Sequence, residues 1–525
     1  MAFTILVVAL PVLAWVQDDA FITFRALDNL LHGHGLRWNP AERVQVFTHP
    51  LWLLLHVPLV AVTGEVYLST MALSALLGGL TAWLVAWRVA PTARLGWLAL
   101  LALLLSRSYL DWTSSGLENP LTRLLLTALA LALLGDPRRR LLRCGCLASG
   151  AALCRPDAFL LFLPALVSSY RHTPRGRRAV TLLIALAPLL GWVAFATIYF
   201  GSPLPNTALA KLGGGVPWAG RLTQGVVFLA VSALRDPWTL LVTVGGALWV
   251  LRGRSPLRPL AWGSLCFLAY LVWMGGDYTL GRFLDAAFLA ALLALLHDPR
   301  AAELAARATR RTALRWATAG AACAAIQAGG VAVFGDIDPL GIADERRVYA
   351  PFTGLLPGLV SKLIDPERPW PDHDWRADGL TARHTVAADT PRIAVDEGVG
   401  MLGYYAGPAV YIVDTNALTD PFLARLPAHL PSAFVVPGRR RESWRPGHLA
   451  RTLPPGYLAT LESGSDRFTE PELSKLWRDV ELAHRAPLLA PGRARAIFEL
   501  ALRRYRPALR AYVARHPEDF GVARP

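Results

Sequence analysis

The stretch AVTLLIALAPLLGWVAFATIYF at residues 179–200 contains no charged side chain, and it follows the arginine-rich segment RHTPRGRR at 171–178. A helix that crosses the hydrocarbon core of a bilayer needs about 20 predominantly apolar residues. Basic residues beside such a helix mark its cytoplasmic end. The two stretches together therefore predict a membrane-spanning helix that enters from the cytoplasm at its N-terminal end.

The whole chain has the composition of a membrane protein. Of its 525 residues, 54% are hydrophobic and 17% are charged, whereas soluble domains carry about 25% charged residues. The long apolar runs lie before about residue 334, and acidic and polar residues gather after it. This division predicts a polytopic α-helical transmembrane domain at 1–334 and a C-terminal α/β domain with a helical tail at 335–525.

The apolar runs predict about eleven transmembrane helices. They lie near residues 1–17, 66–88, 95–112, 117–136, 144–155, 157–170, 179–200, 237–251, 259–274, 283–297 and 313–334. This assignment places the arginine clusters between the runs on one side, the cytoplasm. The short segment 49–62, which holds His56 and two prolines, is predicted to lie on the outer membrane surface. The C-terminal domain is then extracytoplasmic, and the protein is a multi-pass protein of the cell (inner) membrane.

Charge and cysteine content exclude other classes. The net charge of +15 would suggest nucleic-acid binding in a soluble protein, but here the arginines cluster in short loops between apolar runs. We therefore expect no nucleic-acid partner. All five cysteines lie in or beside apolar segments, so the C-terminal domain must fold without disulfides. Neither the cysteines nor His32 and His34 offer a third ligand at useful spacing, and no metal site is predicted.

The C-terminal region alternates strand-like and helical segments. RIAVDE at 392–397, AVYIVDT at 409–415 and AFVVP at 433–437 predict strands, and residues 471–484 and 493–516 predict helices. A G-x-G-x-x-G pattern follows the first strand, at Gly398, Gly400 and Gly403. Dinucleotide-binding folds need an acidic residue about 20 positions further on, and Asp414 comes too early. The glycines therefore predict a tight strand-to-helix turn.

Polar residues in the predicted outer loops suggest catalysis. Asp18 and Asp19 directly follow the first apolar run, where a carboxylate pair is costly to desolvate; alternatively, they only terminate the helix. Other outer loops add Glu118, Arg155, Asp157, Asn206, Lys211, Asp277 and Arg282. A carboxylate can deprotonate an acceptor hydroxyl, and cations can hold a phosphate leaving group. The pattern fits group transfer from a phosphorylated lipid; a scaffold or regulator of envelope machinery is the alternative.

Several segments resemble, in the same order, the terminal arabinofuranosyltransferases of mycobacteria and their bacterial relatives, which are GT-C enzymes that use polyprenyl-phosphate arabinofuranose. The first is QDDAFITFRALDNLLHGHGLRWNPAERVQVFTHPLW at 17–52. The others are SGLENPL, RPDAF, YFGSPLPNTALAK, GGDYTLGRFL, GIADERRVY, GYYAGPAVYIVDTNALTDPFLARLP and WRPGHLARTLPPGYL, and together they cover about residues 18–460. The resemblance implies a lipid-linked sugar donor and no separate cofactor.

The resemblance also assigns roles to residues. It implies a general base in the aspartate pair, with Asp18 favoured over Asp19. Donor-phosphate or substrate contacts carry over to Arg25, Lys211, Arg282 and Arg155. Further substrate candidates are His49, Glu118, Asn206, Asp277 and His448. His49 stands where relatives often have asparagine, and His448 either faces the acceptor or bonds a backbone carbonyl. The sugar can also be mannose, aminoarabinose or another pentose. The acceptor is an envelope glycan such as a wall arabinan, a lipopolysaccharide or a pilin protein, and the sequence leaves these alternatives open.

Overall fold

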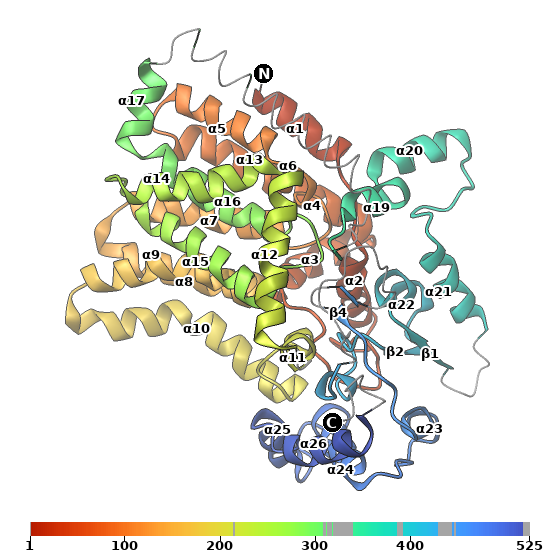
Figure 1. The fold of residues 1–525 in the computed structure, drawn as a ribbon. Helices are drawn as coiled ribbons and strands as arrows, with labels where there is room; N and C mark the ends of the chain where they lie inside the picture. Colours follow the sequence, from red (N-terminus) through yellow and green to blue (C-terminus); the bar gives the residue numbers. More distant parts are fainter. Residues whose placement is uncertain are drawn as a thin grey trace. The chain divides into compact units, whose positions relative to one another are not determined.

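The computed structural model describes residues 2–213, 216–307, 311, 318, 340–385, 392–428, 444–445 and 448–517. The chain forms two compact units, both of which are discontinuous in sequence (Figure 1). The first unit comprises Met1–Gln17, His49–Leu189 and Trp218–Pro371, and the second comprises Asp18–Thr48, Leu190–Pro217 and Asp372–Pro525. The predicted boundary at residue 334 lies outside the described residues. The units differ from the predicted domains because residues 18–48 and 190–217 pack with the C-terminal region.

The first unit is helical. Its helices are α1 (Ala2–Val12), α3 (Pro50–Thr63), α4 (Tyr67–Leu84) with η1 (Val85–Val89), α5 (Ala93–Leu105), α6 (Arg107–Asp111), α7 (Asn119–Leu134), η2 (Pro137–Arg139), α8 (Arg140–Cys154), η3 (Pro156–Ala158), α9 (Phe159–His172), α12 (Trp218–Arg235), α13 (Pro237–Leu240), η4 (Leu241–Gly246), α14 (Ala247–Leu251), α15 (Arg258–Met274), α16 (Leu284–Leu296), α17 (Pro299–Arg307), α19 (Glu345–Thr353) and α20 (Leu355–Ile364). Helix α10 (Arg175–Phe200) begins in the first unit and ends in the second.

Helix α16 forms the centre of the first unit. Its sequence LDAAFLAALLALL is apolar on every side beyond its first turn, which contains Asp285, and all of its residues except Leu295 are buried. A helix of this kind is stable only when other helices surround it. Small residues allow these neighbours to approach closely. A Cβ atom on Gly263 of α15 would lie 2.2 Å from the carbonyl oxygen of Leu161 in α9, so only glycine fits at that crossing.

Fewer described helices than predicted have the length and hydropathy of a membrane span. Among the described residues, Tyr67–Val89 and Arg175–Phe200 are long and apolar enough to cross a membrane. A third span results if Trp218–Arg235 and Pro237–Leu251, which are bent by 116°, are counted as one. The helices predicted at 66–88 and 179–200 are therefore confirmed. The sequence analysis did not predict the helix at 218–235, and the predicted helix at 313–334 lies outside the described residues.

The predicted number of eleven spans is not confirmed. Four further apolar helices have only 10–17 residues: Pro50–Thr63, Ala93–Leu105, Asn119–Leu134 and Leu284–Leu296. At 1.5 Å per residue, a helix of 13 residues rises only about 20 Å, whereas the hydrocarbon core is about 30 Å thick. The segment at 49–62 does form a helix, α3; its predicted position on the membrane surface stays a prediction.

The surface of α10 is that of a helix in lipid. Val180, Leu183 and Ile198 are each about 60% exposed along its length, at 62%, 62% and 61%. Such a continuous apolar surface on a 26-residue helix is unfavourable in water and favourable against acyl chains. With the span Tyr67–Val89, it makes the chain a membrane protein.

The second unit mixes helices with short strands. Its elements are α2 (Asp18–Leu31), α11 (Asn206–Gly213), α21 (Asp374–His384), β1 (Arg392–Asp396), α22 (Val399–Ala406), β2 (Val410–Asp414), η5 (Leu423–Arg425), β3 (Trp444–Arg445), β4 (His448–Leu449), α23 (Tyr457–Ser463), α24 (Pro471–His484), α25 (Arg493–Ala501) and α26 (Arg506–Arg515). Strands β1 and β2 pair in parallel, with Asp396 opposite Asp414. Helix α22 connects them, as parallel pairing requires a crossover.

The sequence predicted most of these elements. The strands at 392–397 and 409–415 and the helix at 471–484 are confirmed as β1, β2 and α24. The strand predicted at 433–437 lies outside the described residues. The predicted helix at 493–516 is divided into α25 and α26 because Arg503 adopts a left-handed conformation, with φ of 55°, which a continuing helix cannot contain.

The C-terminal tail packs with the first loop of the chain. His484, at the end of α24, receives a backbone hydrogen bond from the Arg43 N–H at 2.8 Å, and its Nδ1 lies 3.1 Å from the Arg43 carbonyl oxygen. Arg485 pairs with Glu42 at 3.3 Å. The tail, to which the sequence assigned no role, therefore supports the loop that follows α2, the helix that begins with the aspartate pair.

Candidate functional site

The aspartate pair begins helix α2 in the second unit. Asp18 is buried, and its carboxylate receives backbone hydrogen bonds from the N–H groups of Gly400, at 3.1 Å, and Met401, at 2.7 Å. These two N–H groups belong to the first turn of α22. The first N–H groups of a helix have no partner within the helix and attract a negative charge. The Asp18 carboxylate therefore caps α22 across a long sequence separation.

Burial determines the acidity of Asp18. Removal from water, with smaller contributions from the neighbouring carboxylates of Asp19 and Asp396, raises the pKa of its carboxyl group to about 7, against the opposing effect of the N–H groups of Met401 and Gly400. A general base works best when its pKa is close to the operating pH. Asp18 therefore has the acidity that proton abstraction at neutral pH requires. Asp19, its neighbour, is half-buried.

The glycine pattern of the β1–α22 turn serves helix packing. Strand β1 ends at Asp396 and α22 begins at Val399, which confirms the predicted tight turn. A Cβ atom on Gly400 would lie 2.1 Å from the Asp18 carbonyl oxygen, and one on Gly403 would lie 2.8 Å from the Trp38 ring. The glycines thus let α22 approach α2 and Trp38. The Asp18 carboxylate occupies the helix terminus where a dinucleotide fold binds its pyrophosphate.

Arg25 and Asn206, two predicted substrate contacts, bind backbone in the second unit. Arg25 is 2% exposed, and its guanidinium donates to the carbonyl oxygens of Trp38, Gly403 and Val410. The side-chain amide of Asn206 donates to three carbonyl oxygens of one loop, those of residues 417, 418 and 420. This geometry supports a structural role for both side chains. Their predicted substrate contacts stay predictions.

The second unit also contains two more predicted contacts. Lys211 is half-buried in the last turn of α11, and His448 is half-buried in β4. A buried arginine links these elements, because Arg451 donates to the carbonyl oxygens of Ala210, in α11, and Leu449, in β4. Lys211 and His448 therefore lie on elements that are held together, and their substrate contacts stay predictions.

Four predicted residues meet in the first unit. Glu118, at the N-terminal end of α7, is fully buried, and its Oε2 lies 3.0 Å from Nδ1 of His49. Its Oε1 lies 3.3 Å from Nη1 of Arg155 and 3.5 Å from Nη2 of Arg282. These side chains come from four separate segments of the sequence. We call Glu118, His49, Arg155 and Arg282 the Glu118 cluster.

The arginines of the Glu118 cluster are partly accessible. The side chains of Arg155 and Arg282 are 13% and 11% exposed, whereas that of Glu118 is 0% exposed. Arg155 also forms two hydrogen bonds with Asp157, at 2.9 and 3.0 Å. Asp277, another predicted contact, accepts a hydrogen bond from the Thr279 hydroxyl. Guanidinium groups are well suited to bind an anion such as a phosphate, although all three guanidinium nitrogens of Arg155 already contact Glu118 or Asp157.

The sequence analysis missed Gln17, which directly precedes the aspartate pair. Gln17 is 1% exposed in the first unit, and its backbone N–H donates to the Ser115 carbonyl oxygen at 2.9 Å. Its side-chain amide donates to the Tyr278 hydroxyl at 3.3 Å and to Glu345 at 3.2 Å. These partners lie in SGLENPL, GGDYTLGRFL and GIADERRVY. Three of the quoted segments thus contact Gln17. Its position next to Asp18 in the sequence is the feature that could have pointed to it.

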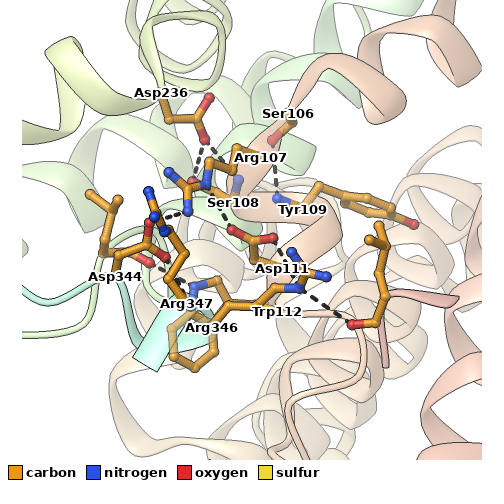
Figure 2. Close-up of polar contacts among 12 residues, drawn as sticks. Ser106, Arg107, Ser108, Tyr109, Asp111, Trp112, Asp236, Asp344, Arg346 and Arg347 are labelled. Atoms are coloured by element: carbon orange, nitrogen blue, oxygen red, sulfur yellow. Dashed lines mark hydrogen bonds and ion pairs between the residues drawn. The ribbon is translucent and has the colours of Figure 1, made fainter. Parts of the chain in front are cut away.

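A second ionic network holds the segment GIADERRVY in the first unit. Figure 2 shows Arg107 of α6 between Asp111 and Asp344, and the Arg107–Asp111 distance is 2.9 Å. Arg346 lies 3.6 Å from Asp111. On the other side of α6, Asp236 accepts hydrogen bonds from the backbone N–H and hydroxyl of Ser108, at 2.7 and 2.6 Å (Figure 2). The network fixes the segment that carries Glu345.

Comparison with known proteins identifies relatives. The chain is 29% identical over 499 residues to the terminal β-(1→2)-arabinofuranosyltransferase of Mycobacterium tuberculosis, with 78% of each chain covered. It is 26% identical over 333 residues to the protein of the same name from Corynebacterium glutamicum, which covers 53% of this chain and 47% of that protein. No family model matches the chain, and no solved structure matches it.

Proposed function

We propose that this chain, a relative of the terminal arabinofuranosyltransferases, is a membrane glycosyltransferase that transfers an arabinofuranosyl unit from a polyprenyl-phosphate donor to a glycan of the cell envelope. The observation that carries the proposal is the 29% identity, which extends over 78% of both chains. The acidity of Asp18 and the paired arginines of the Glu118 cluster supply the types of group that this reaction needs. The apolar α10 supports a location in the cell membrane, where a lipid-linked donor resides.

The proposed reaction is a displacement at the anomeric carbon of the donor sugar. A hydroxyl oxygen of the acceptor forms the new bond to this carbon, and the bond from the carbon to the phosphate oxygen breaks. Polyprenyl phosphate leaves with the electron pair of that bond, and the hydroxyl proton passes to a carboxylate. We assign this carboxylate to the aspartate pair, with Asp18 as the base because burial raises its pKa to about 7.

The leaving phosphate needs positive charge, because negative charge grows on its oxygen as the bond breaks. Arg155 and Arg282 share the buried Glu118 carboxylate and keep partly exposed edges. Glu118 holds the two guanidinium groups close together despite their mutual repulsion. We assign the phosphate contact to these two arginines, with Lys211 as a further cation.

Transfer by the purified chain tests the proposal. The full chain in detergent is given synthetic polyprenyl-phosphate arabinofuranose and an arabinan oligosaccharide, and the product is measured by mass spectrometry. We expect the acceptor to gain one pentose. Parallel reactions with polyprenyl-phosphate mannose or aminoarabinose test the alternative sugars, and a preference for either would contradict the assignment of arabinofuranose.

A comparison in cells identifies the acceptor. Wall arabinan, lipopolysaccharide and the glycans attached to pilin are compared by mass spectrometry in cells with and without the protein. We expect one of these three to lack a terminal pentose when the protein is absent. If no glycan changes and the purified chain transfers none of the sugars, the protein is not a transferase and the scaffold or regulator alternative holds.

A further inference from the structure

Helix α20 exposes its apolar side chains instead of burying them. Its sequence LLPGLVSKLI forms a helix from Leu355 to Ile364. The most exposed large hydrophobic residues in this part of the first unit are Leu363 at 84%, Ile364 at 81%, Leu359 at 51%, Leu356 at 47%, Val360 at 46% and Phe352 at 43%. At 100° per residue, the five of them that belong to the helix fall within about 140° of its circumference. We call these five residues the α20 apolar face.

The side of α20 that packs against the first unit carries the small residues Gly358 and Ser361, and Lys362, which lies outside the apolar face, is exposed. Gly358 is the buried residue of the helix, and Ser361 beside it is half-buried. A helix on a water-exposed protein surface has the reverse arrangement, with its apolar side toward the core. The distribution on α20 therefore indicates an apolar surrounding on its outer side.

The structure fixes α20 to the end of a membrane-spanning helix. Tyr67 is the first residue of the span Tyr67–Val89, and its hydroxyl donates to the carbonyl oxygen of Thr353, just before α20. The Tyr67 ring also contacts the Trp370 ring, with centroids 5.0 Å apart. A Cβ atom on Gly358 would lie 2.2 Å from that tryptophan ring, so Trp370 packs between α20 and the span.

A second attachment joins α20 to the segment that follows α1. The backbone N–H of Leu355 donates to the carbonyl oxygen of Ala14 at 2.9 Å, and α20 lies beside α1 and beside α19 (Figure 1). Helix α1 exposes Val7, Val8 and Val12. Helix α20 therefore lies next to α1, a helix that also exposes apolar side chains.

We propose that α20 lies in the interface of the bilayer, with the α20 apolar face inserted among the acyl chains at the end of the span Tyr67–Val89. The end of a spanning helix lies at the membrane interface, where tyrosine and tryptophan residues such as Tyr67 and Trp370 are enriched. An amphipathic helix held at this depth inserts its apolar side into the boundary between headgroups and acyl chains. The charged residues Asp365, Glu367 and Arg368 that follow the helix are exposed and remain in the headgroup region.

Site-specific photocrosslinking in a lipid bilayer tests the proposal. The full chain carries p-benzoylphenylalanine in place of Leu363 and is reconstituted into phosphatidylcholine and phosphatidylglycerol vesicles. Glu367, which is exposed beyond the end of the helix, carries the same group in a matched control. Ile198 of α10, which is 61% exposed, is the position expected to contact lipid. After irradiation, mass spectrometry identifies what each position has captured.

We expect Leu363 to capture phospholipid in a yield similar to that of Ile198 and several-fold above that of Glu367. Capture of a second copy of the chain, or no capture of lipid at Leu363, would overturn the proposal. If the crosslinker variant does not fold, a Leu363→Cys variant without the chain's native cysteines carries a bimane fluorophore instead. Nitroxide lipids should then quench the bimane fluorescence more strongly than iodide in the aqueous buffer does. Stronger quenching by iodide would also overturn the proposal.

Discussion

The carboxylate of Asp18 accepts a hydrogen bond of 2.7 Å from the backbone N–H of Met401, although the two residues are 383 positions apart in the sequence. This bond joins the first residue of α2 to the first turn of α22. It fixes the direction of the carboxylate and partly compensates for its burial. The candidate base is thus held by the C-terminal part of the chain, which gives that part a role in positioning it.

Replacement of the two aspartates separates basicity from shape. Asp18→Asn keeps an oxygen that can accept the Met401 N–H, but it cannot take up a proton. General-base assistance is typically worth about 100- to 10,000-fold, so we expect transfer to fall by about that factor while the donor still binds. The lost bond to Gly400 costs about 1 kcal/mol, which a melting curve can detect.

Asp19→Asn is the matched control for this experiment, and we expect a smaller effect on transfer. If Asp19→Asn is instead the sensitive variant, the reaction stands and the base is Asp19. Normal turnover by both variants would show that the pair has only a structural role.

The pH dependence of transfer should report the acidity of Asp18. Burial raises the pKa of this carboxyl group to about 7, and a base acts only when it is deprotonated. We therefore expect kcat/KM to increase with pH, to reach half its maximum at about pH 7 and to remain constant above it. Asp18→Asn should lose this dependence.

Stability should change in the opposite direction. A carboxyl group whose pKa is raised by folding stabilises the folded state at low pH, and this contribution is lost as pH rises through the raised pKa. Burial also raises the pKa of the Asp420 carboxyl group to about 7. Asp420 therefore changes the stability in the same direction as Asp18. The Tm should therefore decrease slightly while transfer increases. A Tm that increases in parallel with activity would mean that the activity profile reports folding.

Gly400→Ala tests the contact between α2 and α22. The added Cβ atom would lie 2.1 Å from the Asp18 carbonyl oxygen and 2.5 Å from its Oδ2. Overpacking of this kind costs about 1–3 kcal/mol, and it displaces the Asp18 carboxylate. We expect a lower Tm together with at least tenfold slower transfer.

Gly191→Ala in α10 is the control, because its added Cβ atom meets nothing within 4 Å. Alanine is the better helix former by about 1 kcal/mol, so we expect this variant to be as stable and as active as the unchanged chain. If Gly400→Ala has the Tm and the transfer rate of the unchanged chain, the close approach of α22 to α2 has no influence on Asp18.

Removal of positive charge tests the phosphate contact. We expect Arg282→Ala and Lys211→Ala to raise the KM for polyprenyl-phosphate arabinofuranose and to lower kcat, because less charge remains to stabilise the leaving phosphate. Arg282→Ala should have the larger effect, since Arg282 shares Glu118 with Arg155. Arg504→Ala is a control on an exposed pair with Glu499. Wild-type turnover by both Arg282→Ala and Lys211→Ala would contradict the assignment.

Single-cysteine labelling tests the predicted topology. Arg139 lies in an arginine cluster predicted to be cytoplasmic, and Ser465 lies in the region predicted to be extracytoplasmic; both are exposed. In a chain without native cysteines, we expect a membrane-impermeant maleimide to label Ser465→Cys in intact cells and Arg139→Cys only after permeabilisation. Labelling of both positions from the same side would contradict the predicted orientation.

The sequence predicted local elements well and long-range contacts only in part. The strands β1 and β2 and the helix α24 follow from hydrophobic pattern and turn residues, which are local properties. The predicted number of spanning helices is not confirmed for the described residues, because hydropathy does not show that an apolar run such as Asn119–Leu134 is a short helix. The sequence predicted only that Glu118, Arg155 and Arg282 lie on the same side of the membrane. It did not predict that they contact one another.

By itself, the sequence determined that the chain has the composition of a membrane protein, that a carboxylate pair follows its first apolar run, and that its C-terminal region contains strands at 392–397 and 409–415. Only the tertiary structure decided that Asp18 caps α22, that Arg25 binds backbone carbonyls and that α20 directs its apolar face outward. The reason is physical. Hydropathy and turn chemistry act over a few residues, whereas the burial and the partner of a charged side chain depend on segments that meet only when the whole chain has folded.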